Sequence, residues 1–109
     1  MTYEEVVGKS VITYKNADAS AINGHVAIQF NVTGEAEGAF YLEVTDGKID
    51  IQPYEYYDRD AIIIVDTPTL VDILDGRLTI DEAYNDERLS VQGNLGAALL
   101  VTKIKSKKK

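Results

Sequence analysis

A period-two alternation of large apolar residues limits the fold of this chain more than any other feature. Apolar side chains fall at every second position over residues 26–32, 40–44 and 49–51. Successive side chains of a strand point to opposite faces of a sheet, so each stretch predicts a strand with one apolar face. Asp46-Gly47 joins the second stretch to the third, and this dipeptide is typical of a two-residue hairpin. The three strands are therefore predicted to form an antiparallel meander whose apolar face needs a cover of helices.

Two more strands are predicted further along the chain. Residues 61–65 are apolar and mostly β-branched without polar alternation, which indicates a strand that is central in the sheet and buried on both faces. Leu89 and Val91 predict a short last strand that ends at Gly93.

Four helices are predicted to supply the cover. Residues 2–15 carry apolar side chains at steps of three and four, as an amphipathic helix does. Thr67-Pro68 predicts the start of a second helix, with threonine as the cap and proline as the first helical residue, and Gly76 predicts its end. Residues 79–82 have the spacing of a capping box before a third, short helix. Asn94 is expected to cap a last helix that runs to about residue 104. The predicted fold class is α+β.

Length and composition point to one small intracellular domain. A chain of 109 residues forms a single core with little surplus, so residues 1–104 are taken as one domain and residues 105–109 as a Lys-rich tail. The absence of cysteine excludes disulfides, thiolate nucleophiles and sulfur-ligated metals. The first residues do not have the pattern of a secretion signal, and no apolar run is long enough to cross a membrane. We therefore expect a cytoplasmic protein.

The charge distribution argues against nucleic-acid binding. The net charge is -7, and five of the 11 basic residues are lysines at positions 103–109. The remaining chain is strongly acidic and would repel phosphates. The Lys-rich tail could contact anionic lipid headgroups, or it could serve only as a solubilising end of the chain.

No segment of the sequence predicts catalysis, a metal site or a cofactor. His25 is the only histidine, and its place at the start of a strand favours a structural role. The acidic run 54–60 lacks the glycine and the spacing of a calcium loop, which favours a plain connection between strands. Its tyrosines Tyr54, Tyr56 and Tyr57 fit either the rim of an apolar cavity or packing on a sheet edge. Residues 93–96 lack a phosphate-binding signature, so their glycines are expected to serve close packing.

The order of several short segments resembles the sterol carrier protein type-2 (SCP2) domain family. They are residues 31–35, 38–42, 46–47, 60–63, 74–78, 83–84 and 89–93, and the resemblance extends from about Thr2 to Val101. The sequence departs from the family pattern at Glu87, where many members have glycine. The end of the chain is not the peroxisomal Ser-Lys-Leu, and the chain is similar to free-standing prokaryotic members.

The resemblance implies a five-stranded mixed, mostly antiparallel sheet in which a crossover places the strand at 61–65 beside the first strand. Helices cover one face, and a hydrophobic tunnel between the layers holds a fatty acid, an acyl thioester, a sterol-like molecule or a phospholipid. We expect a lipid carrier without catalytic activity, with the C-terminal helix as a movable cover. The predicted lining comprises Phe30, Phe40, Leu42 and Ile51 from the sheet and Leu70, Leu74, Tyr84, Ala97 and Leu100 from the helices.

Two other functions fit the same sequence. The domain could be an accessory module that presents an acyl or isoprenoid substrate to a partner enzyme. It could also have lost the cavity and act as an interaction module, with the tyrosines of residues 54–57 at the contact.

Overall fold

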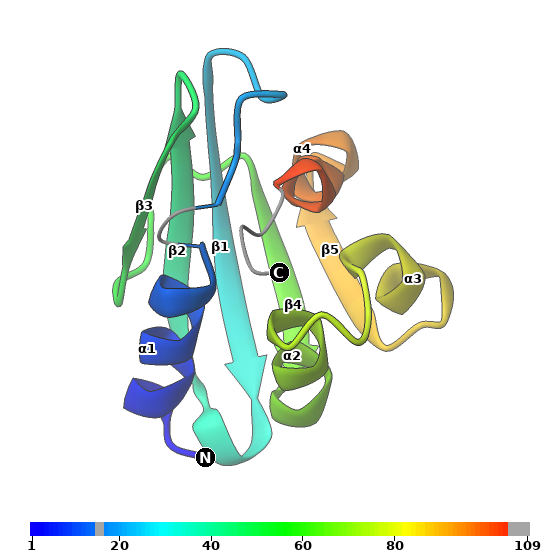
Figure 1. The fold of residues 1–109 in the computed structure, drawn as a ribbon. Helices are drawn as coiled ribbons and strands as arrows, with labels where there is room; N and C mark the ends of the chain where they lie inside the picture. The colour runs from blue at the N-terminus through cyan, green and yellow to red at the C-terminus, as the bar shows by residue number, and fades with distance from the viewer. Residues whose placement is uncertain (15–16, 105–109) are drawn as a thin grey trace.

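A computed structural model describes residues 1–14 and 17–104 of the chain. Five strands form one sheet, and helices lie against one of its faces (Figure 1). In chain order the elements are α1 (Tyr3–Tyr14), β1 (His25–Thr33), η1 (Gly34–Ala36), β2 (Gly38–Thr45), β3 (Lys48–Gln52), β4 (Ala61–Asp66), α2 (Thr67–Leu74), α3 (Ile80–Asn85), β5 (Leu89–Gly93), α4 (Leu95–Leu99) and η2 (Leu100–Lys103). The predicted end of the first helix at residue 15 and the Lys-rich tail lie outside the described residues.

The sheet has the strand order β3-β2-β1-β4-β5. Strands β1 and β4 are parallel, with Phe30 opposite Ile63, and the other three pairs are antiparallel. The parallel pair requires a crossover between the meander and β4. The predicted mixed five-stranded sheet with the strand from residue 61 beside the first strand is therefore confirmed.

The β2–β3 hairpin forms at the predicted dipeptide. Thr45 pairs with Lys48, so Asp46 and Gly47 make a two-residue loop. Both have positive φ, 50° and 84°, which is the requirement of a type I′ turn and explains the choice of residues.

Strand β4 lies in the interior of the sheet, between β1 and β5, as predicted, but it is not fully buried on both faces. Ile63 and Val65 face the helices and are buried, whereas Ile62 and Ile64 on the opposite face are half-buried. That prediction was wrong because the helices cover only one side of the sheet, so the second face of β4 is only partly shielded from solvent (Figure 1).

The start of α2 also differs from the prediction. Asp66 is the N-cap, because its Oδ1 accepts a hydrogen bond from the Thr69 amide at 2.8 Å. The Thr67 hydroxyl donates to the Thr33 carbonyl at 2.8 Å and accepts from the Ala36 amide at 3.0 Å. Thr67 is thus the first helical residue, and it joins α2 to the end of β1 instead of capping the helix.

The two remaining helix predictions have different outcomes. The capping box of Thr79 and Glu82 forms as expected before α3. The last helix is wrong as a single α-helix over 95–104, because α4 ends at Leu99 and continues as the 3-10 helix η2. Asn94 does cap it, accepting from the Ala97 amide at 3.0 Å.

The core lies between the sheet and the helices. Phe30 of β1 and Phe40 of β2 stack with ring centroids 5.0 Å apart. Val6 of α1, Leu70 of α2 and Ala98 of α4 pack above the sheet with no more than 1% of their surface exposed. Burial of each of the larger side chains stabilises the folded state by about 1.5–3 kcal/mol. This central part of the interface between sheet and helices is solidly filled.

Candidate functional site

The helix layer contains an apolar recess of about 180 Å³, which we call the helical recess. It lies between the end of α1, the end of α2, the α2–α3 connection and η2. Its lining comprises Thr13, Tyr14, Ile73, Leu74, Gly76, Leu78, Thr79, Ile80, Val101, Thr102 and Ile104. None of these described residues has a charged side chain, so the recess suits an apolar guest.

The turn after α2 explains how the chain surrounds this space. Gly76 has a φ of 81°, and the amides of Gly76 and Arg77 bond back to the carbonyls of Ile73 and Asp72 at 3.1 and 2.9 Å. These are the two hydrogen bonds of a Schellman motif, in which glycine adopts the left-handed conformation at low cost. The reversal brings Leu78 back to the same recess as Ile73.

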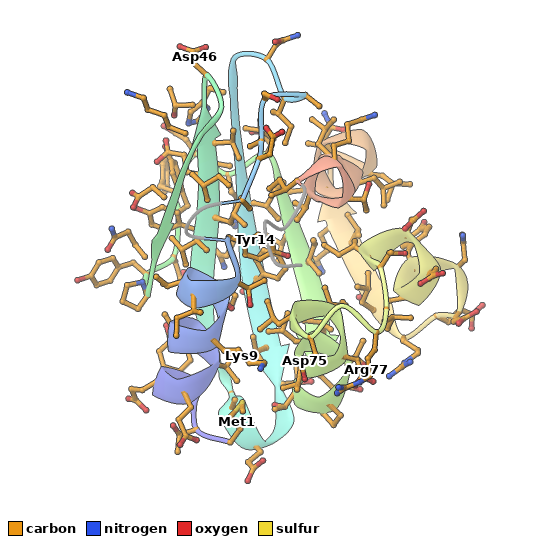
Figure 2. All side chains as sticks on the ribbon, in the orientation of Figure 1. Met1, Lys9, Tyr14, Asp46, Asp75 and Arg77 are labelled. Carbon is orange, nitrogen blue, oxygen red and sulfur yellow. The ribbon has the colours of Figure 1, made fainter. Side chains whose placement is uncertain are left out.

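A second recess of about 160 Å³ lies between α1 and the edge strand β3, and we call it the β3 recess. It is lined by Val11, Tyr14, Ile49, Asp50 and Ile51. Tyr14 is common to both linings, so this one side chain borders both recesses. In Figure 2 Tyr14 lies at the end of α1, near the middle of the molecule.

Tyr14 has an unusual environment for a phenol. The residue is half-buried, and burial raises the pKa of Tyr14 to about 12. None of the hydrogen bonds found among the described residues involves the Tyr14 hydroxyl. Thr13 and Thr79 line the same recess, but their side chains bond to other partners.

The segment η2 closes one side of the helical recess. Val101 and Ile104 are buried against the core, while Thr102 between them is exposed. The 3-10 helix has poorer hydrogen-bond geometry than an α-helix, and the segment follows the five-residue helix α4. Val101 of η2 and Ile104 directly after it are the two buried apolar side chains that attach this cover to the core.

Ion pairs hold α1 against α2 beside the recess. Lys9 Nζ lies 2.5 Å from Asp75 Oδ1, and Figure 2 shows the two side chains between the helices. Arg77 pairs with Asp72 at 2.8 Å and with Asp75 at 3.1 Å, and Arg88 pairs with Asp72 at 3.2 Å. The hydrogen bond from Arg77 lowers the pKa of Asp72, and the bond from Lys9 lowers the pKa of Asp75.

The predicted lining residues are divided among several environments. Leu74 lines the helical recess and Ile51 lines the β3 recess. Phe30, Phe40, Leu42 and Leu70 are buried in the filled core. Ala97 is buried in α4, and Leu100 is half-buried where η2 begins. The structure thus brings two of the nine residues to these openings.

Tyr84 lies away from both recesses. Its side chain is 36% exposed, and it lines a separate groove of about 690 Å³ between α3 and strands β4 and β5, whose walls include Asp66, Glu87 and Arg88. Ala83 is fully buried, and consecutive helical residues differ by about 100° in direction. Tyr84 therefore points outward because Ala83 points inward.

The only histidine belongs to a polar cluster on the sheet face opposite the helices. His25 Nε2 lies 2.5 Å from Glu43 Oε2, and the Tyr56 hydroxyl donates to the same carboxylate at 2.9 Å. Tyr56 also packs edge-on against Tyr41, with centroids 4.7 Å apart. In the acidic run, Tyr56 thus packs on the sheet, while Tyr54 and Tyr57 are exposed. Within residues 1–14 and 17–104, no three acidic or histidine side chains are grouped as metal ligands.

Most residues that line the helical recess are not among those predicted from the sequence. Tyr14, Val101 and Ile104 were visible only as members of apolar stripes, and a stripe does not show whether its residues meet a neighbour or an opening. The described chain also has no helix that is both long and apolar enough to span a bilayer.

Comparison with known proteins gives a consistent fold. No curated protein matches the sequence. Among solved structures, the sec-alkylsulfatase Pisa1 from Pseudomonas sp. is similar with a TM-score of 0.73 and 13% identity over 90% of this chain, which spans only 16% of that enzyme. Palmitated SCP2L2 from Aedes aegypti has a TM-score of 0.70 and 15% identity over 94% of this chain and 93% of its own.

A third structure, the ubiquinone synthesis protein UbiJ-SCP2, has a TM-score of 0.67 and 13% identity over 93% of this chain and 90% of its own. At such identities these likenesses show the fold alone. The family is shown by the sequence, because the model of the SCP-2 sterol transfer family matches residues 10–105. The chain therefore belongs to the SCP-2 sterol transfer family.

Proposed function

We propose that this protein binds one aliphatic lipid with its tail in the helical recess and carries it between membranes or proteins without altering it. The family supports a lipid-carrying role, and a relative of the same fold is palmitated. The observation that carries the proposal is the recess itself, an opening between α1, α2 and η2 whose described lining has no charged side chain.

Energetics explain the use of such a carrier. Moving a sixteen-carbon chain into water costs on the order of 0.8 kcal/mol per methylene, or roughly 12 kcal/mol. A recess walled by Ile73, Leu74 and Leu78 resembles the bilayer interior as a solvent. Transfer of the lipid tail from the membrane to the protein then changes its free energy by only about a few kcal/mol, which allows both uptake and release.

The recess must enlarge to hold a whole lipid. At about 180 Å³ it is smaller than the roughly 300–1,000 Å³ typical of ligand pockets. Displacement of η2 would remove Val101 and Ile104 from its wall, and a shift of Tyr14 would join it to the β3 recess. In this proposal Phe30, Phe40, Leu42 and Leu70 form the floor reached on opening, and Ala97 and Leu100 form the hinge of the cover.

A pair of tryptophan variants tests the site. Ile73→Trp fills the helical recess from α2, and Ile12→Trp places the same side chain on α1, where Ile12 is 78% exposed and lines neither recess. We expect Ile73→Trp to weaken binding of a fluorescent fatty acid by about tenfold or more and Ile12→Trp to leave it unchanged. Ala97→Trp is less informative, because Ala97 is packed in the core and tryptophan would strain it.

The proposal also predicts what the purified protein contains. Native mass spectrometry after purification without detergent should show one bound lipid, and the protein should speed lipid transfer between vesicles. Equal affinities for the two tryptophan variants, or a ligand-free protein that binds no lipid probe, would contradict the proposal.

A second function is favoured by one comparison. In the alkylsulfatase the same fold forms only 16% of an enzyme, so this domain could present a lipid substrate to a partner enzyme. Co-purification with an enzyme, together with negligible transfer between vesicles, would support that alternative. The cytoplasmic location and the contact of the Lys-rich tail with anionic membranes stay predictions.

A further inference from the structure

Tyr14 has a position that the proposed function does not yet use. It is the residue common to the linings of the helical recess and the β3 recess. We propose that the Tyr14 hydroxyl donates a hydrogen bond to an uncharged oxygen of the ligand, an ester or thioester carbonyl or an alcohol, and so selects lipids with neutral heads. This inference rests on the proposed function and deepens it.

The first argument is the unused hydrogen-bonding capacity of the phenol. A tyrosine hydroxyl is both donor and acceptor, and when buried it nearly always has a partner. Tyr3 and Tyr56 follow this rule, donating to the Ala39 carbonyl and the Glu43 carboxylate. Tyr14 makes no hydrogen bond with the described residues, and those residues contain no fully enclosed polar side-chain atom without a partner. Its hydroxyl therefore keeps some accessible surface, on a side chain that borders both recesses.

The second argument concerns charge. Burial raises the pKa of Tyr14 to about 12, which means that an anion at this position is poorly solvated. A ligand carboxylate beside the hydroxyl would meet the same penalty. The described walls of the helical recess offer no cation to offset it, and the β3 recess adds an acidic residue, Asp50. An uncharged oxygen has no such penalty and still accepts the hydrogen bond.

The third argument is the arrangement of space around Tyr14. A fatty acid or a fatty alcohol ends at its polar head, whereas an ester or thioester continues beyond the carbonyl, so this argument applies to the esters and thioesters alone. The tail can occupy the helical recess while the group beyond the carbonyl extends toward Val11 and Ile51 of the β3 recess. Two spaces that share this one side chain fit a molecule with a polar atom between two apolar parts.

The test compares Tyr14→Phe with the matched control Tyr57→Phe, since Tyr57 is 93% exposed. The probe is diphenylhexatriene, a hydrocarbon that cannot accept the hydrogen bond, and the competitors are methyl hexadecanoate, hexadecanol and hexadecanoate. Tyr14→Phe should weaken the binding of methyl hexadecanoate and of hexadecanol by roughly 3- to 10-fold, which is the effect of losing one neutral hydrogen bond. It should leave the affinity for diphenylhexatriene unchanged, and Tyr57→Phe should change nothing.

The outcomes separate this inference from the proposed function. If the wild type binds neither diphenylhexatriene nor any competitor, the carrier proposal fails. A second outcome concerns Tyr14 alone, when the wild type does bind these ligands. If Tyr14→Phe binds the ester and the alcohol as tightly as the wild type does, Tyr14 is not a head-group donor. The same conclusion follows if its affinity for diphenylhexatriene falls as much as its affinity for the ester. Tighter binding of hexadecanoate than of its methyl ester at neutral pH would overturn the preference for uncharged heads.

Discussion

Lys9 and Asp75 connect the two helices that flank the helical recess, with Nζ and Oδ1 2.5 Å apart. Both side chains are partly exposed, so water and salt weaken their attraction. We expect Lys9→Gln to lower the free energy of unfolding slightly, and the decrease should vanish at high salt. Lys48→Gln is the matched control, because Lys48 lies at the exposed start of β3 and forms none of the described ion pairs. Urea denaturation at low and high salt measures both, and a salt-independent loss would exclude an electrostatic origin.

Acid should loosen the same region. The pKa values of Asp72 and Asp75 are below their ordinary value of 3.8, chiefly because Arg77 and Lys9 donate hydrogen bonds to the two carboxylates. Groups with lowered pKa in the folded state stabilise it above the unfolded-state pKa, and this contribution is lost as the pH falls through the folded-state value. The free energy of unfolding should therefore fall below about pH 4.

The substitution Asp75→Asn provides the check for this acid dependence. It removes one of the two titrating carboxylates, so the variant should be less stable than the wild type at neutral pH and should lose less stability on acidification. Denaturation curves recorded at neutral and acidic pH compare the two proteins, and parallel losses would assign the acid sensitivity to other carboxylates.

The sequence predicted the sheet better than the lining of the recess. The meander of the sheet follows from interactions between residues close in the sequence, whereas the recess depends on contacts between distant segments. Alternation and the Asp46-Gly47 turn are local, and they predicted the meander correctly. At α2 the local cap is Asp66, and the hydroxyl of Thr67 is instead engaged by Thr33 and Ala36, which lie more than thirty positions away in the sequence and are invisible to local capping rules.

The helical recess could not be predicted from the local sequence pattern for a similar reason. Leu70 and Leu74 belong to one apolar stripe of α2, yet Leu70 is in the filled core and Leu74 lines the opening. The distance between neighbouring helices decides which side chain meets a partner. That distance depends on the Schellman turn at Gly76 and on the short η2 segment, neither of which the hydrophobic pattern shows.

Alkaline pH should expose the burial of Tyr14. Its pKa of about 12 in the folded protein exceeds the ordinary value of 10.0, so the unfolded chain loses this proton first. The contribution to stability is complete below pH 10 and is lost as the pH rises toward 12.

Burial also raises the pKa of Tyr3 and Tyr41, and for this reason the wild type must be compared with Tyr14→Phe. The wild type should lose on the order of 2 kcal/mol more than the variant over this range. Identical pH profiles of unfolding would show that the Tyr14 hydroxyl is solvated.

Glu87 has a backbone conformation that glycine favours. Its φ is 60°, in the left-handed region that costs an L-residue about 1–2 kcal/mol. Glycine removes this cost but adds roughly 0.5–1 kcal/mol of backbone entropy lost on folding. We therefore expect Glu87→Gly to raise the free energy of unfolding by up to about 1 kcal/mol. Asp46→Gly is the control, since Asp46 also has a positive φ of 50° but aspartate tolerates this region better, so its gain should be smaller. Chemical denaturation of the three proteins decides the matter, and a destabilised Glu87→Gly would mean that the carboxylate makes a stabilising contribution larger than the strain.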